Sequence, residues 1–88
     1  MNKLDQLVED KIGTWDPVKF AKDCYIFETD VSTDEHGVVR GVTCFIQKDE
    51  TSYYFSACQP TINKAIKVAA LKSVGVSLDR IQETLEEK

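Results

Sequence analysis

The most apolar stretch of the chain runs from Thr61 to Ser73, TINKAIKVAALKS. Wound at about 100° per residue, its apolar side chains cover more than half of a helical cylinder and leave a narrow polar stripe with Lys64 and Lys67. Pro60 before the stretch and Gly75 after it are typical start and stop signals. The pattern predicts a helix that is covered on more than one side, and its alanines favour close packing on a sheet.

Three shorter segments also carry helical patterns. Residues Asn2–Ile12 place their aliphatic side chains on one stripe, with acidic and amide side chains facing away. Asp16 is a good N-cap and Pro17 a good first helical residue, so we expect a short helical turn over Val18–Asp23. Residues Val76–Glu87 form a last amphipathic segment.

Between these helical segments, apolar and polar residues alternate with a period of two, as in β-strands. Three β-rich runs cover Cys24–Val31, Val38–Gln47 and Thr51–Cys58. The polar turns that separate them, residues 32–37 and 48–50, are short. Runs joined by such turns favour an antiparallel meander.

Composition agrees with a single folded domain over residues 1–88. Apolar residues make up 42% and charged residues 30% of the chain, which is typical of a globular protein. No apolar run approaches the roughly 20 residues that span a bilayer, and the N-terminus lacks the apolar core of a signal peptide. We therefore expect a cytoplasmic α+β domain, ordered α-α-β-β-β-α-α, in which helices pack on a small three-stranded antiparallel sheet.

Charge and cysteine content restrict the kinds of binding and thiol chemistry that we expect of this chain. The net charge of −4, from 15 acidic and 11 basic residues, disfavours binding that depends on neutralising phosphates. The three cysteines, Cys24, Cys44 and Cys58, form no C-x-x-C pair. Because cysteines within β-rich runs are usually buried, we expect reduced thiols that react slowly.

The single histidine, His36, lies in an acidic turn with Asp30, Asp34 and Glu35. A calcium loop starting at Asp30 would need glycine at its sixth position and an acid at its twelfth, where the sequence has Glu35 and Gly41. That spacing argues against a metal site. Nothing in the spacing supports a cysteine nucleophile activated by His36, and the chain has no Gly-rich phosphate loop. We expect no catalytic, cofactor-binding or metal-binding residues.

Aromatic residues in the third run are candidates for a partner surface. Alternation sends Tyr53 and Phe55 to one face of the sheet and Tyr54 to the other. If one face of the sheet is uncovered, Tyr54 with neighbours such as Thr43 or Phe45 would form a partner surface or a dimer interface. For each of these side chains taken singly, packing in the core is the role that we expect.

Trp15 is the only tryptophan and lies in the connector before the second helical segment. Large aromatic side chains in small domains usually pack against the core, and we expect this of Trp15. A platform for a ligand is the alternative role.

Three strands followed by a helix with Lys64 and Lys67 resemble double-stranded RNA-binding modules in topology. In such modules, lysines at the start of a helix contact phosphates. The same two lysines are equally explained as the solvated stripe of the helix. The acidic balance of the chain disfavours the nucleic-acid interpretation, because the electrostatic contribution dominates such binding.

The whole layout also resembles the phage ABA-sandwich family, small proteins encoded by phages and prophages. The resemblance rests on the opening LDQLVEDKI followed by G-T-W, on the D-P turn, and on SACQPTINKAIKVAALKSVGV, a small-residue and proline lead-in to an Ala-rich helix. It covers about residues 4–76. The resemblance implies an α-β-α sandwich and carries no functional residues over to this chain.

The resemblance implies a phage or prophage accessory protein of the host cytoplasm, and the lack of a catalytic constellation predicts that it is non-enzymatic. We expect it to act by binding a host protein, with a counter-defence role as one form of this, and to form a homo-oligomer. Nucleic-acid binding through Lys64 and Lys67 is one alternative. A small-molecule ligand held between subunits is another.

Overall fold

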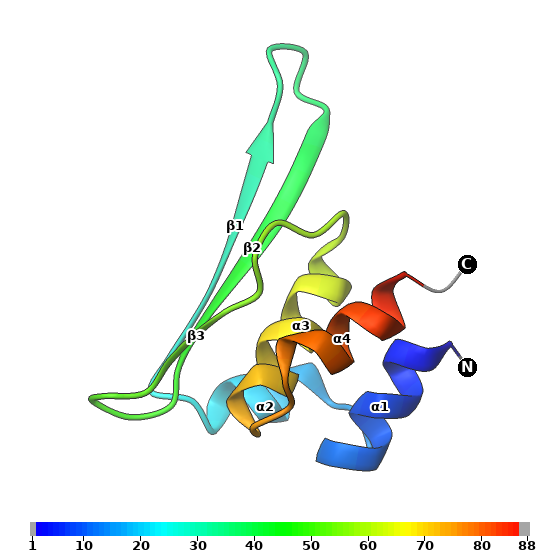
Figure 1. Ribbon diagram of the computed structural model, residues 1–88. Coiled ribbons are helices and arrows are strands. Elements are labelled where there is room, and N and C mark those ends of the chain that lie inside the picture. The colour runs from blue at the N-terminus through cyan, green and yellow to red at the C-terminus, as the bar shows by residue number, and fades with distance from the viewer. Residues whose placement is uncertain (1, 87–88) are drawn as a thin grey trace.

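The computed structural model describes residues 2–86, within which four helices pack on one three-stranded antiparallel sheet (Figure 1). This confirms the predicted α+β fold and its element order. The last residue of the predicted C-terminal helix, Glu87, lies outside the described residues. The elements are α1 (Lys3–Ile12), α2 (Pro17–Lys22), β1 (Ile26–Thr33), β2 (Val39–Gln47), β3 (Tyr53–Phe55), α3 (Ile62–Ser73) and α4 (Leu78–Leu85).

Each helix begins where a polar side chain caps its first turn. The Asp16 carboxylate accepts hydrogen bonds from the backbone N–H groups of Val18 and Lys19, as its position before Pro17 predicts. Three further side chains cap the other helices in the same way: Asn2 for α1, Thr61 for α3 and Ser77 for α4. The caps satisfy backbone donors that would otherwise be left free, so they fix the helix starts.

The third strand is much shorter than predicted. It covers Tyr53–Phe55, because the chain then leaves the regular ladder through Ala57, whose φ is +60°. Ser56 stays tied to β2: its N–H donates to the Cys44 carbonyl at 2.9 Å, and its hydroxyl accepts the Cys44 N–H at 2.8 Å. Pairing with β2 resumes only at Gln59. A short third strand is the result.

The core lies between the sheet and α3. Alternate β2 side chains, Val42, Cys44 and Ile46, point toward the helix and are buried with Ala65, Ile66 and Ala69 of α3. A second buried cluster joins α3 to α1 and α4 and comprises Leu4, Leu7, Val8, Val68, Leu71 and Ile81. The apolar width of α3 is thus explained, since this helix packs on the sheet and on two helices.

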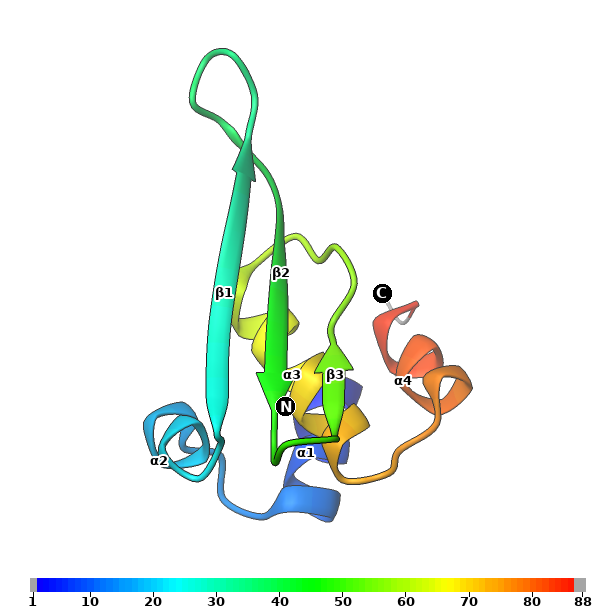
Figure 2. The same ribbon diagram turned by 90° about the vertical axis from the view of Figure 1, so that its left-hand side faces the viewer.

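The helices of residues 2–86 all lie on one side of the sheet (Figures 1 and 2). The arrangement therefore differs from the α-β-α sandwich that the family resemblance implies, because the opposite face of the sheet carries no helix in the described chain. None of these helices is long and apolar enough to cross a membrane.

The β1–β2 hairpin extends well beyond the helices (Figure 1). Its tip is held by Asp34, whose carboxylate accepts the N–H groups of His36 and Val38 at 2.8 and 3.0 Å. The acidic turn noted in the sequence thus has a structural role at this position.

Candidate functional site

The face of the sheet turned away from the helices carries three clustered aromatic side chains. Phe45 of β2 lies opposite Phe55 of β3, with ring centroids 4.8 Å apart, and the Tyr53 ring is 6.0 Å from Phe45. Tyr53 and Phe55 remain 54% and 56% exposed. We call Phe45, Tyr53 and Phe55 the aromatic patch, and the side of the sheet that carries it the outer face.

The turn before β3 holds the aromatic patch in position. The Asp49 carboxylate accepts hydrogen bonds from the backbone N–H groups and the hydroxyls of Thr51 and Ser52. These bonds, the Thr51 backbone N–H first, lower the pKa of Asp49. The Tyr53 hydroxyl donates to the Glu50 carbonyl at 3.2 Å. The hydroxyl of the first aromatic side chain of β3 is therefore bonded to the turn that precedes the strand.

Tyr54, the tyrosine that sequence analysis placed in the partner surface, lies on the other side of the sheet. It pairs with Ile46 and packs, half-buried, against the core beneath α3. The prediction of Tyr54 as a neighbour of Phe45 in an exposed surface is therefore wrong. Alternation correctly separated Tyr53 and Phe55 from Tyr54, but it does not reveal which of the two faces the helices cover.

The outer face is acidic where it crosses β1. Glu28 lies opposite Phe45 and Asp30 opposite Thr43, and both carboxylates belong to exposed residues. The strand positions that share this face contain no lysine or arginine; they are Ile26, Glu28, Asp30, Ser32, Gly41, Thr43, Phe45, Gln47, Tyr53 and Phe55. Aromatic rings beside carboxylates attract cations and repel phosphates.

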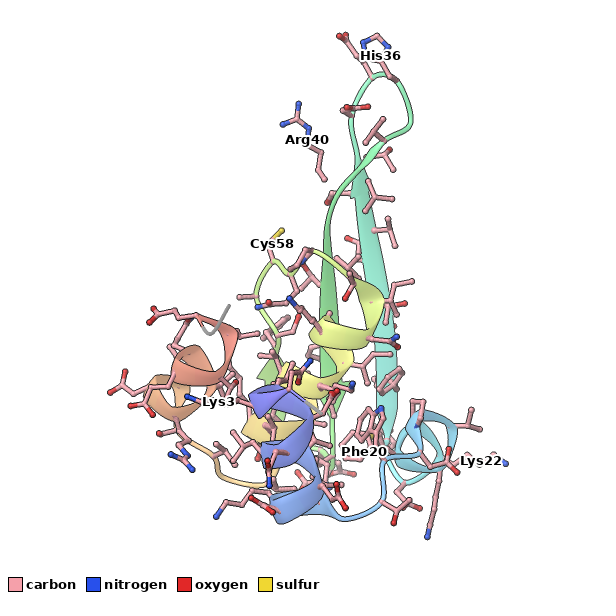
Figure 3. All side chains as sticks on the ribbon, turned by 90° about the vertical axis from the view of Figure 1, so that its right-hand side faces the viewer. Lys3, Phe20, Lys22, His36, Arg40 and Cys58 are labelled. Carbon is pink, nitrogen blue, oxygen red and sulfur yellow. The ribbon has the colours of Figure 1, made fainter. Side chains whose placement is uncertain are left out.

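A shallow apolar groove of about 550 Å³ lies beside the start of β1, on the helix side of the sheet. Two of its residues, Val18 and Tyr25, are exposed large side chains. Lys22, another lining residue, belongs to α2 and lies on the side of this helix opposite Phe20 (Figure 3). The groove is lined by Pro17, Val18, Ala21, Lys22, Cys24, Tyr25, Phe27 and Ile66.

Trp15 packs against both buried clusters, and its ring is tilted against that of Phe20, with centroids 5.8 Å apart. It is half-buried, and its remaining surface lines a pocket of about 290 Å³ together with Asp5 and Lys67. The structure therefore gives this side chain the packing role expected from the sequence.

Of the two lysines in the nucleic-acid alternative, Lys67 is already paired with a carboxylate. The Lys67 ammonium donates to the Asp5 carboxylate of α1, and the Lys67 side chain is only 18% exposed. A third lysine of α3, Lys72, donates to the Phe55 carbonyl at 2.7 Å. Lys64, in the first turn of α3, is half-buried. A lysine already neutralised by a carboxylate contributes little to phosphate binding.

The histidine and the cysteines do not converge on one site. His36 lies at the hairpin tip, far from Cys58 in the loop before α3 (Figure 3). Burial raises the pKa of the Cys44 thiol to about 11, and it also raises the pKa of Cys24. Within residues 2–86 no three His, Cys, Asp or Glu side chains gather closely enough to hold a metal ion.

Cys58 departs from the prediction of buried thiols, because it is exposed. Its sulfur lies directly over Gly41, where an added Cβ would come within 2.1 Å of Sγ. Close packing against Cys58 thus explains the glycine at position 41.

We expect Ellman's reagent at pH 8 to modify one thiol of the folded protein quickly and two slowly. Cys58 is accessible, whereas Cys44 is fully buried and only about one in a thousand of its thiols is ionised at that pH. Cys58→Ser should remove the fast phase. A fast phase that survives this substitution, or three thiols that react together, would contradict the assignment.

Comparison with protein-family models, curated proteins and solved structures gives no match for this chain.

Proposed function

We propose that this protein works without catalysis, by binding another protein through the outer face of its sheet. The observation that carries the proposal is the aromatic patch, in which Tyr53 and Phe55 are more than half exposed on a face without helices. Contiguous exposed apolar surface is uncommon on proteins without partners. Aromatic side chains are also enriched among the residues that dominate binding energy in protein interfaces.

The charges around the aromatic patch favour a protein over a nucleic acid. Aromatic side chains on an open antiparallel sheet are able to stack on bases, but such surfaces also need cations that follow the phosphates. Here the nearest strand supplies Glu28 and Asp30 instead. The Lys67 ammonium is occupied by Asp5 on the other side of the sheet. The groove beside the start of β1 is lined mainly by apolar side chains, so it does not supply the polar pocket that the small-molecule alternative needs.

Although the helices of the described chain lie on one side of the sheet only, the sequence motifs that resemble the phage ABA-sandwich family favour a bacterial host protein as the partner. In this proposal the protein is a phage or prophage accessory factor that acts in the host cytoplasm, and interference with a host defence component is one such role. Self-association through the aromatic patch is the competing use of the same surface, and sedimentation of the purified protein distinguishes the two.

The test is affinity capture from bacterial lysate with three matched baits. The double variant Tyr53→Thr/Phe55→Thr removes the two exposed rings but keeps β-propensity, so it should fold. Leu78→Thr is the control, since Leu78 is 52% exposed but lies on α4, in the helix layer. We expect the unmodified protein and the control to retain the same partner. The affinity of the double variant for that partner should be lower by a factor of about 100 or more.

Equal recovery of the partner by the double variant would show that the aromatic patch is not the binding surface. A partner lost only with the Leu78→Thr bait would move the interface to the helix layer.

A further inference from the structure

The outer edge of β1 offers backbone groups for one more strand. Among the described residues β1 pairs with β2 alone. The Cys44 N–H and C=O are both bonded to Ser56, on the β3 side, so Thr29 opposite Cys44 occupies a non-hydrogen-bonded pair. The N–H and C=O of Thr29 therefore point away from β2, to the outer edge.

The same reasoning extends along the strand. Val42 exchanges backbone hydrogen bonds with Gln59, at 2.7 and 2.9 Å, so its partner Val31 also directs its backbone groups outward. By alternation Phe27 does the same. The free edge thus presents the N–H and C=O groups of Phe27, Thr29 and Val31, whose side chains point to the helix side of the sheet.

The residues between these positions carry the negative charge. Glu28 and Asp30 point to the outer face and are exposed. If two copies of β1 paired antiparallel around Thr29, Glu28 of each copy would lie directly opposite Asp30 of the other. Like charges at directly opposed positions destabilise a strand pair. Charge therefore works against pairing of this edge with itself, as on many protected edge strands.

The helix side of the same edge is apolar. Phe27 borders the groove of about 550 Å³ that Val18 and Tyr25 also line, and α2 lies beside the start of β1 (Figure 2). A strand added to the edge would direct alternate side chains toward this groove and the others toward the carboxylates. The two sides of the edge thus favour different side chains in a docked strand: apolar ones on the helix side and cationic ones on the outer face.

We propose that the edge of β1 docks an extended segment of a partner protein in which arginine or lysine alternates with apolar residues. The inference rests on the proposed function, since it requires a protein partner, and it names the chemistry of that partner. The cationic side chains of the docked strand pair with Glu28 and Asp30, and its apolar side chains cover Phe27 and enter the groove. The backbone groups of Phe27, Thr29 and Val31 form the ladder.

The register strengthens the charge pairing. In an antiparallel addition, Glu28 and Asp30 fall at non-hydrogen-bonded positions, where Cα atoms are only about 4.5 Å apart and side chains contact closely. Arginine or lysine side chains at alternate positions of a straight partner strand therefore reach both carboxylates.

The experiment uses a fluorescein-labelled ten-residue peptide that alternates arginine with valine and threonine, and a matched peptide with glutamate in place of arginine. Binding to the full chain is followed by fluorescence anisotropy. Thr29→Pro removes one outward N–H without touching the β2 ladder, so it should fold; Thr29→Ala is its control. We expect at least tenfold weaker binding of the arginine peptide by Thr29→Pro and unchanged binding by Thr29→Ala.

A charge reversal keeps the test decisive if Thr29→Pro fails to fold. In Glu28→Lys/Asp30→Lys, both changes are at exposed positions, and we expect preference to switch from the arginine peptide to the glutamate peptide. Equal binding of both peptides by the unmodified protein would overturn the proposal. So would a homodimer in sedimentation that Thr29→Pro dissociates, because the edge would then belong to a second copy.

Partner capture separates this inference from the proposed function. Loss of the captured partner with Tyr53→Thr/Phe55→Thr but not with Thr29→Pro would overturn the edge and leave the outer face standing. Loss with Thr29→Pro alone would support the edge and contradict the aromatic patch as the binding surface.

Discussion

Replacing Ala69 by aspartate should abolish the cooperative folding of this protein. Ala69 of α3 is fully buried where this helix packs on β2, in the cluster with Val42, Cys44 and Ile46. A carboxylate there loses its hydration and finds no cation among the residues of this cluster, at a cost of about 4 kcal/mol or more. A domain of this length has only about 4 to 13 kcal/mol of stability. Urea denaturation followed by circular dichroism measures the loss.

The matched control is Asn63→Asp, which adds the same carboxylate to the exposed first turn of the same helix. Its charge lies near the positive end of the helix dipole, so stability should be unchanged or slightly higher. A normal urea midpoint for Ala69→Asp would show that the contact between α3 and the sheet is not the centre of the core.

The second large effect is expected for Trp15→Ala. The Trp15 side chain contacts both buried clusters, the one beneath α3 on the sheet and the one between α1, α3 and α4. Its removal leaves a cavity at their junction and should lower the free energy of unfolding by about 2 to 4 kcal/mol. Trp15→Phe keeps part of the ring contact and should cost about half as much. Chemical denaturation of the three proteins gives both values.

If Trp15→Ala changes stability by less than about 0.5 kcal/mol yet abolishes partner capture, Trp15 is a binding residue rather than a packing residue. The half-buried ring makes this a real alternative to test, because its exposed side lines a pocket with Asp5 and Lys67.

Local chemistry explains why much of the fold was predictable. Asp16 before Pro17 sets the start of α2, and Gly75, with φ of +87°, follows the end of α3 as its position indicates. Short polar turns likewise determined the antiparallel order of the strands. These signals act within a few residues of the chain, so one sequence is enough to find them.

The features that define the candidate site depend on contacts between distant residues. Alternation separates Tyr53 from Tyr54, but only the packing of α3 decides that Tyr54 is covered and Tyr53 exposed. The pairing of Lys67 with Asp5 joins residues 62 positions apart. The early end of β3 depends on the left-handed backbone at Ala57, beside which the Ser56 hydroxyl accepts the Cys44 N–H. These contacts cannot be predicted from periodic patterns in the sequence.

Site-specific photocrosslinking tests most directly whether the outer face is the working surface. Benzoylphenylalanine is placed at position 55, in the aromatic patch, or at position 78, in the helix layer, and each protein is irradiated in host lysate. We expect a discrete crosslinked partner from position 55, competed away by unlabelled protein, and none from position 78. A competed crosslink from position 78, with none from position 55, would contradict this expectation.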